Sequence, residues 1–129
     1  MIHLLDAHAI LWHIEDAPAL GDEARSILND RATQLVVSSI TLSEVRWALL
    51  KKGVADAWAQ LLVTIARDGL FDVYPVTLEI VSRQPIGLEM HDALICSTAL
   101  VLAESTGDDV LVVTIDPQIR ASGLVSTVW

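Results

Sequence analysis

Apolar residues recur along the chain in two patterns, short continuous runs and longer stretches at helical spacing. The short runs predict strands at residues 2–5, 35–37, 71–76, 110–115 and 124–128. The helical spacing predicts helices at residues 7–14, 22–29, 54–67, 78–82 and 92–104. A further helix is expected to start at Thr41 or Ser43 and to stop at Gly53. Strands that alternate with helices favour an α/β sandwich with a mainly parallel sheet.

Composition sharpens this picture. The chain has 129 residues, of which 53% are hydrophobic, and its mean hydropathy is +0.51. We expect one domain, residues 1–129, because this length supports a single core and no linker interrupts it. The apolar runs are too short to span a membrane, so their abundance predicts a sheet that is buried on both faces, with room for a partner surface.

Cysteine content and the first residues bear on localisation. The single cysteine, Cys96, excludes an internal disulfide and fits a reducing compartment. We interpret it as a small buried residue on a helix. The first residues carry Asp6 and no basic segment that would start a secretory signal, so a cytoplasmic protein is expected.

The formal net charge of −9 argues against a protein that binds nucleic acid through a broad basic face. Two bound divalent cations would still leave the chain acidic. A polyanionic substrate must therefore be held locally, by metal and a few cationic side chains.

Four acidic residues stand beside apolar segments. Asp6 and Asp116 follow the predicted strands at 2–5 and 110–115. Asp92 opens a predicted helix, and Glu44 lies in the first predicted turn of another. Because sites in parallel sheets form beyond the carboxyl ends of the strands, we expect these four side chains to converge.

Each acid also has a local explanation. Asp92 could cap its helix, Asp6 and Asp116 could start turns, and Glu44 could favour a helix dipole. Two unscreened carboxylates about 5 Å apart repel by about 3 kcal/mol at an effective dielectric near 20. Four together need protonation or metal, and ligands that are all oxygen favour Mg²⁺ or Mn²⁺ over Zn²⁺.

Four stretches resemble the PIN-domain ribonucleases, and most closely the small toxin subunits of VapBC-type toxin–antitoxin pairs. In order, they are LLDAHAILW (4–12), VSSITLSEV (37–45), HDALICSTA (91–99) and LVVTID (111–116). The resemblance implies a three-layer α/β/α sandwich and an endoribonuclease that depends on Mg²⁺ or Mn²⁺. It also implies an RNA substrate, a homodimer and a cognate antitoxin.

The resemblance also implies residue roles. Asp6, Glu44, Asp92 and Asp116 fall on the family's four acidic positions, which bind metal and carry catalysis, and Thr114 falls on a frequent hydroxyl beside the last acid. The residue after the third acid is often basic in the family, but here it is Ala93, which removes a possible phosphate contact.

Several other side chains are candidates for roles near the site. His3, His8 and His13 recur every five residues, which matches no single helix or strand face. His8 could hydrogen-bond a metal ligand or be structural, and His91 could carry a proton.

Serines, tryptophans and cations near the predicted site each leave two interpretations open. Ser38 or Ser39 could orient a water near Glu44 or cap the next helix. The helical tryptophans could be core residues or anchors for a partner: Trp12, Trp47 and Trp58. The cations that follow Glu44 could contact phosphate or form a solvated face: Arg46, Lys51 and Lys52.

The sequence therefore predicts metal held by Asp6, Asp92 and Asp116, with Glu44 positioning a second ion or a water for in-line attack on phosphorus. Two alternatives remain open at this point. One is an interaction module with the same fold and no turnover. The other is a DNA nuclease or phosphatase that uses the same carboxylates.

Overall fold

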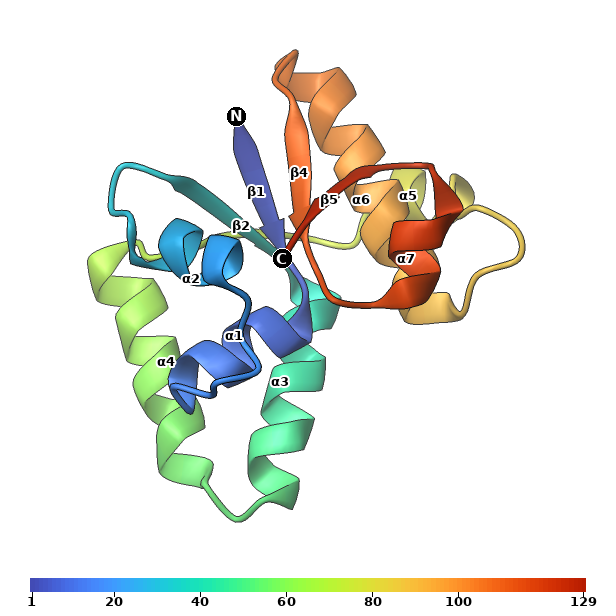
Figure 1. Cartoon of the computed structure of the whole chain (residues 1–129). Coiled ribbons are helices and arrows are strands. Elements are labelled where there is room, and N and C mark those ends of the chain that lie inside the picture. The colour runs from blue at the N-terminus through green and yellow to red at the C-terminus, as the bar shows by residue number, and fades with distance from the viewer.

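Five strands form one sheet in the order β3-β2-β1-β4-β5, and every neighbouring pair is parallel. The computed structural model describes all residues, 1–129 (Figure 1). The strands are β1 (Ile2–Leu5), β2 (Gln34–Ser38), β3 (Asp72–Tyr74), β4 (Val110–Val113) and β5 (Ser126–Val128). Helices cover both faces of this sheet, which confirms the predicted α/β/α sandwich.

Two helical layers flank the sheet (Figure 1). One layer consists of α1 (Ala7–Ile14), α2 (Asp22–Asn29), α3 (Ser39–Lys51) and α4 (Ala55–Asp68). The other consists of α5 (Leu78–Ser82), α6 (Met90–Thr106) and α7 (Pro117–Ser122). None of these helices combines the length and the apolar character that crossing a membrane requires.

Alternate strand residues bury into opposite layers. In β2, Leu35 and Val37 join the core beneath α1 to α4, whereas Val36 joins the core beneath α6 and α7. In β1, Leu4 and Leu5 divide in the same way. A sheet covered on both faces needs apolar residues at successive positions, which accounts for the high hydrophobic content.

The third helix starts earlier than the sequence predicted. Its N-cap is Ser38, whose hydroxyl accepts a hydrogen bond from the Ile40 amide at 3.3 Å. The expected start at Thr41 or Ser43 is therefore wrong: the Thr41 side chain is fully buried, and Ser43 is exposed within the helix. As a result Glu44 lies in the second turn of α3 and not in the first.

Other boundaries differ by a few residues. Strand β3 stops before Pro75, which has no amide hydrogen to donate to a neighbouring strand. Strand β4 ends at Val113 and not at 115, so Asp116 lies three residues beyond it. Helix α6 starts at Met90, which places Asp92 in its first turn and excludes an N-cap role for Asp92.

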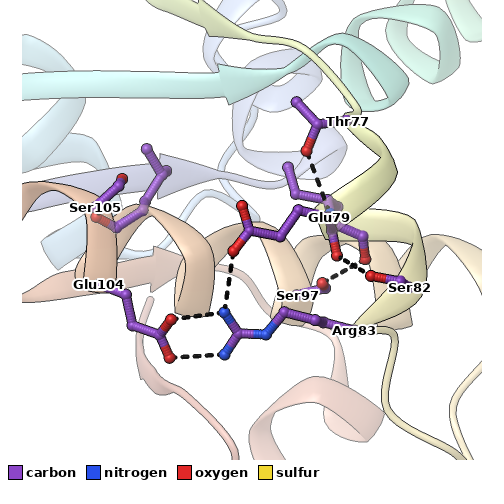
Figure 2. Close-up of polar contacts among 9 residues, drawn as sticks. Thr77, Glu79, Ser82, Arg83, Ser97, Glu104 and Ser105 are labelled. Carbon is purple, nitrogen blue, oxygen red and sulfur yellow. Dashed lines mark hydrogen bonds and ion pairs between the residues drawn. The ribbon is translucent and has the colours of Figure 1, made fainter.

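Polar contacts fasten α5 to α6 away from the carboxyl edge of the sheet (Figure 2). Arg83, just after α5, donates two hydrogen bonds of 2.6 Å to the carboxylate of Glu104 and a longer one of 3.5 Å to Glu79. The buried Ser97 hydroxyl donates to the Ile80 carbonyl at 2.6 Å. These contacts hold the helix that carries Asp92.

Candidate metal centre

The four acidic residues approach one edge of the sheet from four elements. Strands β1, β2 and β4 are adjacent and parallel, so their carboxyl ends meet at this edge. Asp6 follows β1 directly, and Asp116 caps α7 after β4. Glu44 lies on α3, which continues from β2 without a loop, and Asp92 lies in the first turn of α6. Parallel topology therefore gathers residues that are far apart in the sequence.

Asp6 is the most buried of the four, with 7% of its surface exposed. Its Oδ1 accepts a hydrogen bond from the Ala7 amide at 2.7 Å, and its Oδ2 accepts one from the Thr114 hydroxyl at 2.6 Å. The same Thr114 oxygen accepts a hydrogen bond from the Asp116 amide at 3.0 Å. One fully buried hydroxyl thus links the segments that carry the first and last acids.

Asp116 has both a local role and a free oxygen. Its Oδ1 accepts hydrogen bonds from the Gln118 and Ile119 amides at 2.7 and 3.3 Å, which caps α7. Its other carboxylate oxygen makes no hydrogen bond. Asp116 therefore starts a short helix, and this local role leaves one of its oxygens available at the edge.

Glu44 carries a buried carboxylate oxygen, Oε1, with no hydrogen-bond partner. His91 Nδ1 lies 3.0 Å away, within ion-pair distance, but the ring is not oriented to donate a hydrogen bond to that oxygen. Burial raises the pKa of Glu44, as do the nearby charges of Asp6 and Asp92, whereas His91 opposes the rise. A buried carboxylate oxygen without a donor is costly unless it is protonated or binds a cation.

Asp92 has no hydrogen-bond or ion-pair partner for its side chain. Its pKa is raised by burial first, and then by the charges of Asp116, Asp6 and Glu89. The pKa of Asp92 is thus affected by Asp6 and Asp116, and that of Glu44 by Asp6 and Asp92, as expected of acids at one edge of the sheet. None of the ion pairs of the molecule brings a lysine or an arginine to them.

A family model now decides the chain's relationship. The model described as the PIN domain matches residues 3–121. The chain belongs to the PIN domain family. Members of this family are generally nucleases that use divalent metals. No curated protein matches the chain significantly.

Solved structures with the PIN fold include two toxin–antitoxin assemblies. One is VapBC2 from Rickettsia felis bound to a promoter DNA fragment, with a TM-score of 0.70, 17% identity and coverage of 100% of this chain and 99% of that one. Another is a complex from Klebsiella pneumoniae, with a TM-score of 0.69, 20% identity and coverage of 98% and 96%. A third is the PIN domain of T. brucei RRP44, with a TM-score of 0.60, 16% identity and coverage of 98% of this chain and 73% of that one. At these identities, the likeness concerns the fold.

The oxygen donors of Asp6, Glu44, Asp92 and Asp116 suit a divalent cation. No three His, Cys, Asp or Glu side chains, however, are grouped closely enough to form an ion site as they stand. The fit rests on a donor set made only of oxygens, a buried Glu44 oxygen without a donor and the absence of a nearby lysine or arginine partner.

The histidines differ in their surroundings. His8 is exposed on α1, its ring 5.2 Å from that of Trp12. Burial lowers the pKa of His3, and burial followed by the charge of Arg25 lowers the pKa of His13. His91 contacts Glu44.

The predicted serine and cation roles divide as well. Ser38 caps α3, and Ser39 accepts a hydrogen bond from the Val76 amide at 3.2 Å. Lys52 pairs with Glu15 at 2.5 Å, away from the acids, and Lys51 lies over the Trp47 ring. Arg46 is exposed and makes no ion pair.

Sequence reasoning missed a groove beside the PIN site. It is lined by Ile40, Ser43, Glu44, Trp47 and His91. The signal was present, because positions 40, 43, 44 and 47 share one face of a helix. The groove was not predicted, because the helix was expected to start at Thr41 or Ser43, which leaves Ile40 outside it.

Proposed function

We propose that the chain is a Mg²⁺- or Mn²⁺-dependent endoribonuclease and the toxin of a type II toxin–antitoxin pair. The observation that carries the proposal is the group of four acids at the carboxyl edge, which no lysine or arginine neutralises and in which Glu44 Oε1 is buried without a hydrogen bond. Membership of the PIN family and the likeness to two toxin–antitoxin structures support it.

In this proposal, Asp6, Asp92 and Asp116 hold the cation. A bound divalent ion lowers the pKa of a coordinated water and stabilises charge on the phosphoryl oxygens. Thr114 fixes the orientation of Asp6 through its 2.6 Å hydrogen bond, and the amides of α7 fix Asp116. Glu44 binds a second ion or orients the attacking water through Oε1, in line with the leaving oxygen.

Partner binding follows from the apolar surface. A groove of about 180 Å³ between α1 and α4 is lined mainly by apolar side chains, among them Ile10, Leu61 and Phe71. We infer that a segment of a cognate antitoxin binds there and brings a basic side chain to the acids, and that the free chain is a cytoplasmic homodimer. Co-purification with the product of an adjoining small reading frame tests the first point, and light scattering tests the second.

The test of activity uses purified protein with single-stranded or looped RNA and Mg²⁺ or Mn²⁺. We expect cleavage that EDTA abolishes, loss of cleavage in Asp6→Asn, and wild-type cleavage in Glu23→Gln, an exposed acid on α2. No cleavage of any RNA would favour an interaction module without turnover. Preferential cleavage of DNA or of phosphomonoesters would favour the nuclease or phosphatase alternative.

A further inference from the structure

A groove of about 370 Å³ opens beside the acidic site. Residues of α3 form one side, with Ile40, Ser43, Glu44 and Trp47 spaced along one helical face. His91, at the start of α6, completes it. Because Glu44 belongs both to this groove and to the group of four acids, the groove adjoins the proposed metal site.

Trp47 is unlike the other tryptophans. Trp12, Trp58 and Trp129 are partly buried and pack against the main core. Trp47 packs against no core cluster and exposes 64% of its surface. A large aromatic ring exposed beside a proposed site is a candidate contact for a ligand, because covering it would gain the free energy of burying its apolar surface.

A cation accompanies this ring. The Lys51 ammonium lies 4.7 Å from the centre of the Trp47 ring and makes no ion pair. Because no carboxylate pairs with Lys51, its ammonium can leave the ring to pair with a phosphate while a base stacks on the indole. Such local charge is what an acidic protein requires to hold a polyanion.

The surface of the groove is mostly apolar, and three polar side chains also line it: Ser43, Glu44 and His91. A nucleobase fits this combination better than an apolar protein side chain does. An apolar side chain would cover these polar groups without pairing them, which is unfavourable. A base presents donors and acceptors on its edge and a flat face for the indole. Because the groove adjoins Glu44, the phosphate attached to that base would lie near the acids.

We propose that Trp47 is a stacking platform for one unpaired base of the RNA substrate, adjacent to the phosphate that is cleaved. Ser43 and His91 face the edge of that base, and Lys51 neutralises a neighbouring phosphate. The inference rests on the proposed ribonuclease function and deepens it, because a base can stack here only if it is outside a duplex. Single-stranded or extruded nucleotides are therefore the substrate class.

The first test compares Trp47→Ala, Trp47→Phe and wild type for cleavage of an unstructured RNA oligomer in Mn²⁺. Loss of the ring should raise KM by about ten-fold or more with little change in kcat, because the base takes no part in the reaction and its stacking stabilises ground and transition states alike. Trp47→Phe should recover most of the loss. Val63→Ala, which shortens an exposed apolar side chain on α4, should behave as wild type. Wild-type KM in Trp47→Ala would overturn the inference and leave the proposed function standing.

The second test does not depend on turnover. Single-stranded RNA oligomers that carry 2-aminopurine should lose fluorescence on binding to wild type in Ca²⁺, and Trp47→Ala should abolish this quenching. The same quenching in Trp47→Ala would overturn the inference even if no RNA is cleaved. Unchanged RNA binding together with a lost dimer in Trp47→Ala would identify this face as an interface between copies, which also overturns it.

Discussion

The two ends of α6 carry acids in opposite circumstances. At the C-terminal end, Glu104 accepts two hydrogen bonds from Arg83, and these bonds lower its pKa (Figure 2). At the N-terminal end, Asp92 has no cationic partner, and burial and neighbouring carboxylates raise its pKa. The first acid is satisfied by the fold, and the second is left for something that the fold does not supply.

Under the proposed function, this difference separates a structural acid from one that binds metal. An exposed pair such as Arg83 with Glu104 contributes little to stability and mainly fixes geometry. A group of partly buried acids without lysine or arginine partners destabilises a fold, and such groups are typical of functional sites. A helix N-terminus offsets part of the charge of Asp92, but it cannot neutralise four carboxylates.

The largest expected effect sets Asp92→Asn against Glu104→Gln. Asp92→Asn removes a charge that the proposed ion needs, so kcat/KM for RNA should fall by more than about 100-fold, since even outer partners of metal ligands are worth 10- to 100-fold. Glu104→Gln should keep wild-type activity. Both variants should show wild-type circular dichroism. Equal activities in the two variants would erase the functional contrast between the ends of α6.

Thr114→Val tests whether the acids act as one assembly. The substitution keeps the shape of the side chain but removes the hydroxyl that donates to Asp6 Oδ2 and accepts from the Asp116 amide. We expect Mn²⁺ affinity, measured by calorimetry, to weaken by about ten-fold. Thr98→Val is the matched control, because that buried hydroxyl bonds only to the Leu94 carbonyl within α6. Equal affinities in both variants would remove Thr114 from the site.

Sequence patterns anticipated the layers and the acids better than the details between them. The strand at 2–5 and the acid after it follow from a short apolar run and topology. The start of α3 could not be predicted in this way. Four successive candidates are good capping residues, and only the tertiary burial of Thr41 decides among them: Ser38, Ser39, Thr41 and Ser43. The end of β4 was missed because the apolar run continues through 115.

Ion pairs between residues far apart in the chain could not be predicted from the sequence either. Nothing in the chain says that Arg83 reaches Glu104 and that His91 lies beside Glu44. These contacts depend on how α5 and α3 pack against α6, which local spacing does not encode. The distinction between the two ends of α6 is therefore a product of the fold.

Glu44→Gln should sharpen the comparison through the pH dependence of stability without metal. The pKa of Glu44 is raised by burial, so the folded state binds more protons than the unfolded state. The stabilisation is fully present below the unfolded pKa and is lost as pH rises through the higher folded pKa. At neutral pH the variant should therefore melt a few degrees higher than wild type, and the gap should close near pH 4.

Metal supplies the control for that variant. Mn²⁺ should raise the melting temperature of wild type more than that of Glu44→Gln, because it binds only the folded acids. Melting curves across pH, with and without Mn²⁺, measure both effects. A destabilised variant with an unchanged response to Mn²⁺ would mean that Glu44 supports α3 and lies outside the metal site.

The smallest expected effect concerns the paired end of α6, where the sign is reversed. The hydrogen bonds from Arg83 lower the pKa of Glu104, so its contribution to stability is present above the unfolded pKa and is lost as pH falls through the lower folded pKa. Glu104→Gln should therefore lower the melting temperature at neutral pH by about a degree or two, since exposed pairs are weak. The difference should shrink in strong acid and in high salt, where the pair is protonated or screened.

Melting curves at neutral pH, in acid and in high salt measure this difference, with Glu23→Gln, an unpaired acid on α2, as the control. A higher melting temperature in Glu104→Gln at neutral pH would place Glu104 with the strained acids and dissolve the contrast between the two ends.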